Sequence, residues 1–249
     1  VVAVLPVLIF ALVMAVLFSR EQRKGVEDGL VDTARALSLA VDRELMATIR
    51  TLGALATSEH LDSDDLRNFY DQARRVLNAH RGWENVTLMD RTGQQLVSLR
   101  QPFGAPLPHS GVPGLTRQVA ATAQPAVSDL FIGTGSKKPA VAVDVPVLRG
   151  GRVKYVLGAA ISLDALAQIL SQQKIPPAWR AAILDRRKII IARSTGDMVG
   201  RPAPPGISAM STESLEGAGR GSTIEGIPIY AGFSRSTLSG WTVVIGAPV

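Results

Sequence analysis

The sequence predicts an α+β protein in which long N-terminal helices precede two successive units with antiparallel sheets. Residues 21–59 lack proline and carry apolar residues three or four positions apart, which is a helical pattern. From Pro139 to Leu163, β-branched residues alternate along two arms that meet at Gly150-Gly151, which indicates a hairpin. After residue 177 the order of strand, Asp-containing turn and strand returns, which indicates a second, smaller copy.

The composition limits the classes of function. The 249 residues include 27 Lys and Arg against 21 Asp and Glu, for a formal net charge of +6. Because the basic residues stand singly or in pairs without interleaved aromatic residues, we expect no nucleic-acid binding. Basic residues close to lipid head groups account for the charge instead. Cysteine is absent, which excludes disulfides and thiol chemistry.

Residues 1–18 are predicted to form a transmembrane helix. They contain no charged side chain, and as a helix they would extend about 27 Å, close to the hydrocarbon thickness of a bilayer. The alternative is a signal-peptide core, but no small-x-small cleavage site follows it. Arg20, Arg23 and Lys24 flank the C-terminal end of the span, and taken alone this charge would favour the cytoplasm there.

Residues 19–60 are predicted to form a stalk helix. One face of this helix collects the apolar residues Leu30, Ala34, Leu37, Val41, Leu45, Ile49, Leu52 and Leu55. At about 1.5 Å per residue the helix would approach about 60 Å in length, which suits a stalk that rises from a membrane. A shorter, kinked pair of helices broken near Gly53 is the alternative.

Residues 61–175 are predicted to form a membrane-distal unit. Asp62-Ser63-Asp64-Asp65 supplies an N-cap and first-turn acids for its first helix. The expected elements are this helix to about Gly82, strands over 83–89 and 94–99 joined by the turn Asp90–Gly93, a short helix over 115–122, a strand over 126–132, the hairpin, and a helix through Gln172.

The two faces of the hairpin's first arm differ in character. Because strand side chains alternate, one face carries Val141, Val143, Val145 and Val147, and the other carries Ala140, Ala142, Asp144 and Pro146. The valine face is predicted to be core. The second face has one carboxylate among small side chains, which leaves room for a molecule. It is predicted to be either a pocket wall or a solvated strand face.

Residues 176–249 are predicted to form a membrane-proximal unit. Its expected elements are strands over 179–184 and 188–192 around the turn Asp185-Arg186-Arg187, a polar helix near 208–215, and closing strands around 222–225, 229–234 and 241–246.

Residue types that catalyse reactions or bind metals show no functional spacing. His60, His80 and His109 are far apart on different predicted elements, without zinc-like spacing. The run from Gly133 to Lys138 lacks the Gly-Lys-Ser/Thr ending of a phosphate loop and precedes a strand. No hydrolase or metalloprotease motif is found. We therefore expect no catalytic residue, no metal and no cofactor in this chain.

Five phrases of the sequence carry a family resemblance when they are taken in order. They are WENVTLMDRTGQQLVSL and AVAVDVPVLRGGRVKYVLGAAISLDAL, then AAILDRRKIIIARS, VGRPAP and IPIYAGFSRSTLSGWTVVIGAPV. Together they resemble the double Cache (dCache) family of bacterial extracytoplasmic sensor domains, whose units are PAS-like. The resemblance covers essentially the whole chain, and the last three phrases are most similar to sensors of alphaproteobacterial histidine kinases.

This resemblance implies a ligand-sensing region of a receptor in the bacterial inner membrane. Residues from about 20 onward would be extracytoplasmic, which overrides the count of flanking charges. The receptor would be a homodimeric sensor histidine kinase whose catalytic region lies beyond residue 249. The alternatives are a methyl-accepting chemotaxis receptor, a diguanylate cyclase, or a membrane-anchored interaction domain that senses no ligand.

The resemblance also places a pocket under the loops of the membrane-distal unit. The candidate ligand-binding residues are Trp83, Arg100, Phe103, Asp129, Lys137, Asp144 and Tyr155. Arg100 and Lys137 can pair with an anionic small molecule, unless Arg100 and Asp144 pair with each other or face water. Where the amino-acid-binding branch of the family carries Gly-x-Asp, this chain reads Gly158-Ala159-Ala160, with Ala160 in place of the Asp, so the clamp of that branch is not expected.

Overall fold

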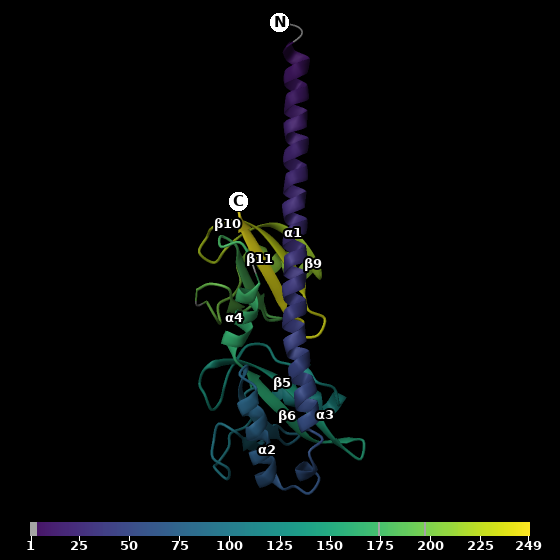
Figure 1. Cartoon of the computed structure of the whole chain (residues 1–249), viewed down its shortest axis with the longest axis vertical. Helices are drawn as coiled ribbons and strands as arrows, with labels where there is room; N and C mark the ends of the chain where they lie inside the picture. Colours follow the sequence, from purple (N-terminus) through teal and green to yellow (C-terminus); the bar gives the residue numbers. More distant parts are fainter. Residues whose placement is uncertain (1–3, 174, 197) are drawn as a thin grey trace.

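The fold is elongated, with two sheets arranged along one long helix (Figure 1). The structure is a computed structural model that describes residues 4–173, 175–196 and 198–249, and between residues 4 and 23 it describes the side chain of Met14 alone. The membrane span predicted for residues 1–18 therefore lies almost wholly outside the residues whose side chains the structure describes. Among the described residues, no helix combines the length and the apolar character needed to cross a membrane.

The long helix is α1 (Val4–Leu55), and its N-terminal part extends beyond the rest of the molecule (Figure 1). The helix continues through Gly53, so the alternative of a break there is wrong. Of the eight predicted stripe residues, Ile49 is half-buried and the other seven are buried. The C-terminal half of α1 is consequently a component of the core.

The first sheet has six strands in the order β2-β1-β6-β5-β3, and β4 also pairs with β5. The hairpin of β5 and β6 turns at Gly150 and Gly151, both with positive φ, as the glycine pair predicts. Asp65 caps α2 by accepting a hydrogen bond from the Asn68 backbone N–H at 3.1 Å. The elements are a 3₁₀ helix (Glu59–Leu61), α2 (Leu66–Ala79), β1 (Trp83–Met89), β2 (Gln95–Ser98), α3 (Pro113–Thr122), β3 (Ala126–Val127), β4 (Phe131–Ile132), β5 (Pro139–Arg149) and β6 (Arg152–Ile161).

The second sheet, in the order β8-β7-β11-β10-β9, repeats the strand order of the first. The turn after each sheet's first strand uses the same device: Asp90 Oδ1 accepts from Gly93 N at 2.9 Å, and Asp185 Oδ1 accepts from Arg187 N at 2.8 Å. The predicted second copy is therefore present, while the predicted unit boundaries stay a prediction. The elements are α4 (Leu163–Gln172), β7 (Arg180–Leu184), β8 (Ile190–Arg193), α5 (Pro205–Glu213), β9 (Glu216–Ser222), β10 (Pro228–Arg235) and β11 (Thr242–Pro248).

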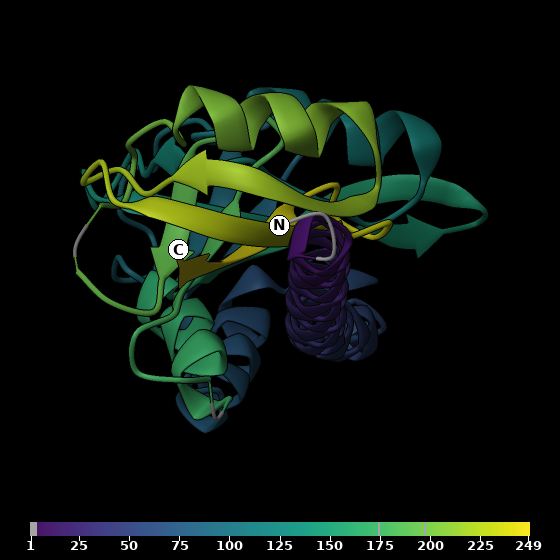
Figure 2. The ribbon, with the colours of Figure 1, turned by 90° about the horizontal axis from the view of Figure 1, so that it is seen from above.

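One continuous apolar core joins α1 to both sheets. It contains the valine face of β5 and, from the second sheet, Ile183 and Ile245, together with residues of α2 and α4. The opposite face of the second sheet is covered by α5 through a separate cluster around Ile207 and Phe233. Figure 2 shows α1 and α5 on opposite sides of this sheet. The first sheet likewise has an outer face, which α3 covers in part through Val119.

The strand predicted over 126–132 is wrong in one respect, because it is two short strands. Between β3 and β4, Ser128 keeps a backbone hydrogen bond to Ala142 of β5, but Ser128 O and Leu130 N bond to Trp241 and Asp185, which adjoin strands of the second sheet. These tertiary partners interrupt the strand, which a local sequence pattern does not reveal.

The strand predicted around 222–225 is displaced, since β9 spans Glu216–Ser222. Its sequence EGAGRGS has low strand propensity, which explains the error. Here the glycines permit close packing under α5: a Cβ at Gly219 would lie 2.5 Å from Met210 Sδ, and one at Gly221 would lie 2.8 Å from Ile207 Cδ1. The absence of side chains is thus a packing requirement of this strand.

The second sheet holds α1 by close packing and by polar contacts. A Cβ at Gly232 of β10 would lie 2.5 Å from the carbonyl carbon of Leu30, so helix backbone and strand backbone are in direct contact. Arg35 of α1 donates three hydrogen bonds to Glu216, at 2.7, 2.9 and 3.1 Å. These contacts therefore fix the position of α1 on the second sheet.

We predict that Gly232→Ala destabilises the protein by about 1 to 3 kcal/mol, because the added methyl group must push α1 away from β10. Urea unfolding followed by circular dichroism measures this change. Gly206→Ala is the matched control, since no atom lies within 4 Å of the added Cβ, and it should leave the unfolding free energy almost unchanged. Equal effects of the two substitutions would contradict the close packing.

Candidate ligand-binding site

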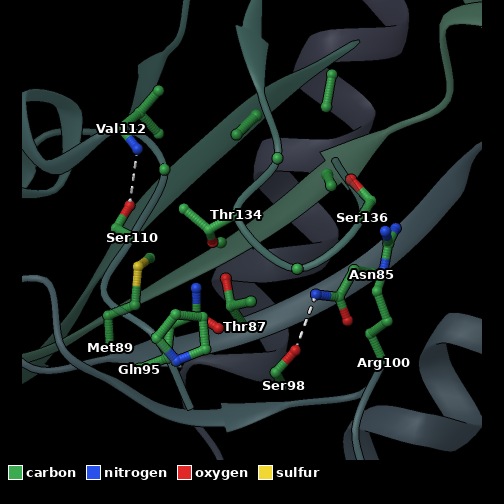
Figure 3. A pocket seen from close by; sticks show the side chains of 18 of the residues that line it. Asn85, Thr87, Met89, Gln95, Ser98, Arg100, Ser110, Val112, Thr134 and Ser136 are labelled. Carbon is green, nitrogen blue, oxygen red and sulfur yellow. Dashed lines mark hydrogen bonds between the residues drawn. The ribbon is translucent and has the colours of Figure 1, made fainter. Parts of the chain in front are cut away.

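A cavity lies on the outer face of the first sheet, away from α1, and strands form its floor while loops form its roof (Figure 3). The cavity has a volume of about 90 Å³, which suits a small molecule rather than a macromolecule. The floor comes from β1, β2, β5 and β6, and the roof comes from residues 107–112 and 131–136.

Strand register brings polar groups and a glycine into one row across the floor. Asp144 of β5 lies opposite Gly158 of β6, Gly158 lies opposite Thr87 of β1, and Thr87 lies opposite Ser98 of β2. All four residues line the cavity. Because Gly158 has no side chain, the carboxylate of Asp144 occupies the space next to it: a Cβ at Gly158 would overlap Asp144 Oδ1.

The adjacent row consists of Ala142, Ala160 and Asn85, which are also opposite one another. The two alanines leave space above the sheet, as predicted from the small residues of β5. Asn85 is buried and its Nδ2 donates to Ser98 Oγ at 3.1 Å. Its Oδ1 has no hydrogen-bond partner among the described residues. A buried acceptor without a donor is costly, so a ligand donor at this atom would stabilise the site.

Asp144 is the carboxylate at the centre of the floor. Its side chain is only 2% exposed, and its described partner is Thr116 Oγ1 of α3, which donates to Oδ2 at 3.4 Å. No Lys, Arg or His of the described chain forms an ion pair with it. Burial raises the pKa of Asp144 to about 7, and the Thr116 hydrogen bond opposes this shift. The group can therefore exist as an acid or as a carboxylate near neutral pH.

The roof is held together by close contacts. A Cβ at Gly111 would lie 2.9 Å from Phe131 Cε2, so the ring of Phe131 closes against the backbone of the other roof loop. Residues 133–138 form a tight turn in which Lys137 N donates to Gly133 O at 2.8 Å. Figure 3 shows Thr134 and Ser136 of this turn above the strand residues Asn85 and Thr87.

Two of the seven predicted site residues, Asp144 and Arg100, line the cavity. Arg100 lies at its rim beside Asn85 (Figure 3) and donates to Glu84 Oε2 at 3.2 Å. The alternative in which Arg100 pairs with Asp144 is therefore wrong, since its acidic partner is Glu84.

The other five predicted residues lie outside the cavity, and all of them except Lys137 have a side-chain partner elsewhere. Trp83 donates from Nε1 to Thr48 of α1 at 3.1 Å, because its ring belongs to the inner face. The remaining four are Phe103 packed edge-on to Tyr70, Asp129 paired with Arg186, Lys137 exposed in the roof turn at a φ of 55°, and Tyr155 hydrogen-bonded to Asp64.

Sequence reasoning missed most of the polar floor and the helix that faces it. Asn85 and Thr87 alternate with Val86 and Leu88 in β1, so the period of two could have identified them as a polar face. Thr116 and Ser110 have no such local signal, because the packing of α3 and its preceding loop places them near Asp144.

The corresponding face of the second sheet also has a cavity, but its lining is different. Aliphatic residues such as Ile190, Ile207 and Val244 form most of it. Arg193, which lines it, is already paired with Glu225 through two hydrogen bonds, at 2.5 and 2.9 Å. The cavity with unpaired polar groups is therefore the one on the first sheet.

The comparisons with known proteins agree with this architecture. No protein-family model matches the sequence, and no curated protein matches it either. Several solved structures do match in three dimensions, at sequence identities that establish the fold alone. The extracellular domain of rpHK1S-Z16, a protein assigned as a histidine kinase, has a TM-score of 0.71 and 12% identity, with 93% of this chain and 97% of that chain covered.

Two further matches have named sources. The ligand-binding domain of the Pseudomonas aeruginosa amino-acid chemoreceptor PctB, in complex with L-Arg, has a TM-score of 0.68 at 16% identity, covering 90% of this chain and 96% of that one. The sensor domain of the V. cholerae histidine kinase DctB has a TM-score of 0.64 at 12% identity, covering 92% and 99%. The chain therefore has the fold of the extracellular, Cache-type sensor domains of histidine kinases and chemoreceptors.

Proposed function

We propose that this chain is the extracytoplasmic ligand-sensing region of a transmembrane receptor, a sensor histidine kinase, and that the cavity on the first sheet binds the ligand. The observation that carries the proposal is the buried carboxylate of Asp144, which faces a cavity without a described cationic partner. Desolvating an unpaired carboxylate costs stability, so its presence is explained by a partner that arrives from outside.

The ligand we propose is a small zwitterion. Its ammonium group would bind Asp144 and the free Oδ1 of Asn85, which are both acceptors on the floor. Its acidic group would face Arg100 at the rim, where the guanidinium already contacts Glu84. The anionic character expected of the ligand from the sequence would thus belong to one end of the zwitterion. PctB, one of the similar structures, holds L-Arg, which has both groups.

The carboxylate that the amino-acid-binding branch of the family carries on β6 is replaced, in this proposal, by Asp144 on the neighbouring strand. The missing Asp corresponds to Ala160, which lies opposite Ala142, two residues before Asp144 on β5. Ala160 and Asp144 both line the cavity, so a carboxylate from either strand can reach it.

Residues 1–18 would anchor the receptor in the membrane, with residues 61–175 as the distal unit and 176–249 as the proximal unit. This arrangement is supported by the position of the second sheet, which lies nearer than the first to the N-terminal end of α1 (Figure 1). Two receptors would form a homodimer through the outward face of α1, where Leu39 is 53% exposed. A chemotaxis receptor is the second candidate, since PctB shares the fold.

A thermal-shift screen of the purified chain tests the binding proposal. We expect L-arginine, L-isoleucine or γ-aminobutyrate to raise Tm by about 5 to 10 °C at concentrations near 100 times Kd. Simple acids such as acetate and neutral sugars should leave Tm unchanged, because they lack the ammonium group.

Asp144→Asn should abolish the shift, whereas Tyr155→Phe, outside the cavity, should retain it. Because the ammonium group needs the ionised carboxylate, the affinity should fall about tenfold per pH unit below the Asp144 pKa of about 7 and level off above it. The proposal fails if no ligand class stabilises the protein, or if Asp144→Asn responds like the native chain.

The absence of cysteine makes the location and the dimer testable by single-cysteine variants in membranes. Ser63→Cys, at an exposed position, should react with a membrane-impermeant maleimide in intact cells with permeabilised outer membranes. Leu39→Cys should form a disulfide-linked dimer. Labelling of Ser63→Cys only after cell lysis would refute the extracytoplasmic location, and the cysteine-free chain gives the background.

A further inference from the structure

Residues Ser128–Leu130, which we call the bridge segment, connect the cavity with the second sheet. The segment leaves the ladder between β3 and β4, and the residue that follows it, Phe131, lines the cavity and closes against Gly111 of the roof. The residues that contact the second sheet are thus directly followed in sequence by a residue of the ligand site.

On the cavity side the bridge segment is tied to the floor. Ser128 N donates to Ala142 O, and Ala142 N donates to Ser128 Oγ, both at 2.8 Å. Ala142 lines the cavity. Both bonds join buried residues, Ser128 and Ala142.

On the side of the second sheet, two buried hydrogen bonds hold the same backbone. Trp241 Nε1 donates to Ser128 O at 3.1 Å, and Leu130 N donates to Asp185 Oδ2 at 3.3 Å. Trp241 and Asp185 are 1% and 0% exposed, so breaking either bond would leave a buried polar group unpaired.

Two arginines of the turn after β7 add exposed contacts. Arg186 Nε donates to Asp129 Oδ1 at 2.8 Å, and Arg187 Nη2 donates to Leu130 O at 2.6 Å. The Asp129 ion pair is solvent-exposed and contributes little on its own, so the buried pair of bonds is the stronger connection. In the first sheet the equivalent turn carries Arg91, which is exposed.

We propose that the bridge segment couples the state of the cavity roof to the second sheet, as a second route beside α1. A roof that closes on a ligand would move Phe131, and the segment would carry this movement to Asp185 and Trp241. Trp241 immediately precedes β11, which packs on α1 in the common core. The coupling goes beyond ligand binding itself, because it joins the ligand site to a second sheet that the ligand does not touch.

Hydrogen exchange detected by mass spectrometry on the native chain, without added ligand, provides that measurement. Trp241→Phe removes the N–H donor and retains the ring. We expect backbone amides of the roof, residues 131–138, to exchange about tenfold faster in this variant, because Ser128 O loses its buried donor. Arg187→Ala should give a smaller increase in the same amides, and Arg91→Ala, the matched control, should give none.

The reverse test uses the cavity side. Phe131→Ala should accelerate exchange at residues 185–189 of the second sheet while residues 216–222 of β9, which do not contact the bridge segment, keep their native rates. Faster exchange confined to the sheet that carries the substitution would overturn the proposal, and so would a uniform increase over the whole chain. Either result leaves the ligand-binding test unaffected, since that test depends on Asp144.

Discussion

The apolar contact between α1 and the inner faces of both sheets is the interaction on which the rest of this structure depends. The stripe from Leu30 to Leu55 forms a single core with the valine face of β5 and with Ile183 and Ile245. Because α1 buries the inner faces of both sheets, the first sheet takes little of its apolar burial from its outer face, which α3 covers only in part through Val119. The outer face of the first sheet is thereby free to carry alanines, a glycine and polar groups, and it is there that the cavity forms.

Asp144 shows how this division permits a functional site. A buried carboxylate without a described cationic partner opposes folding once it ionises, and its raised pKa reflects that cost. The fold tolerates the cost because the valines on the other face of the same strand are fully integrated into the core. In the proposed function a ligand ammonium group supplies the positive charge that Asp144 lacks. The ion pair would offset the desolvation cost of the ionised carboxylate and so favour binding.

The sequence allowed most of the elements to be predicted, because their patterns are local. Valine alternation in β5, the Gly150-Gly151 turn, the Asp90 and Asp185 turns and the stripe of α1 each follow from short-range rules. The errors arose where contacts between residues far apart in the sequence determine the secondary structure. β9 is a glycine-rich strand packed under α5, and residues 128–130 interrupt a strand because they hydrogen-bond to Asp185 and Trp241. The site followed the same rule, since Asp144 was visible as a lone carboxylate, whereas its neighbours Gly158 and Thr116 depend on register and helix packing. Phe103, Tyr155 and Trp83 have suitable side chains, but each is satisfied by another element.

A crystal structure of the protein grown with the zwitterion that gives the largest thermal shift tests the central claim most directly. The account predicts ligand density in the cavity on the first sheet, with the ammonium nitrogen within hydrogen-bonding distance of Asp144 and of Asn85 Oδ1 and with the acidic group toward Arg100. Density for the ligand at the second sheet, or on the floor with its acidic group against Asp144, would contradict it.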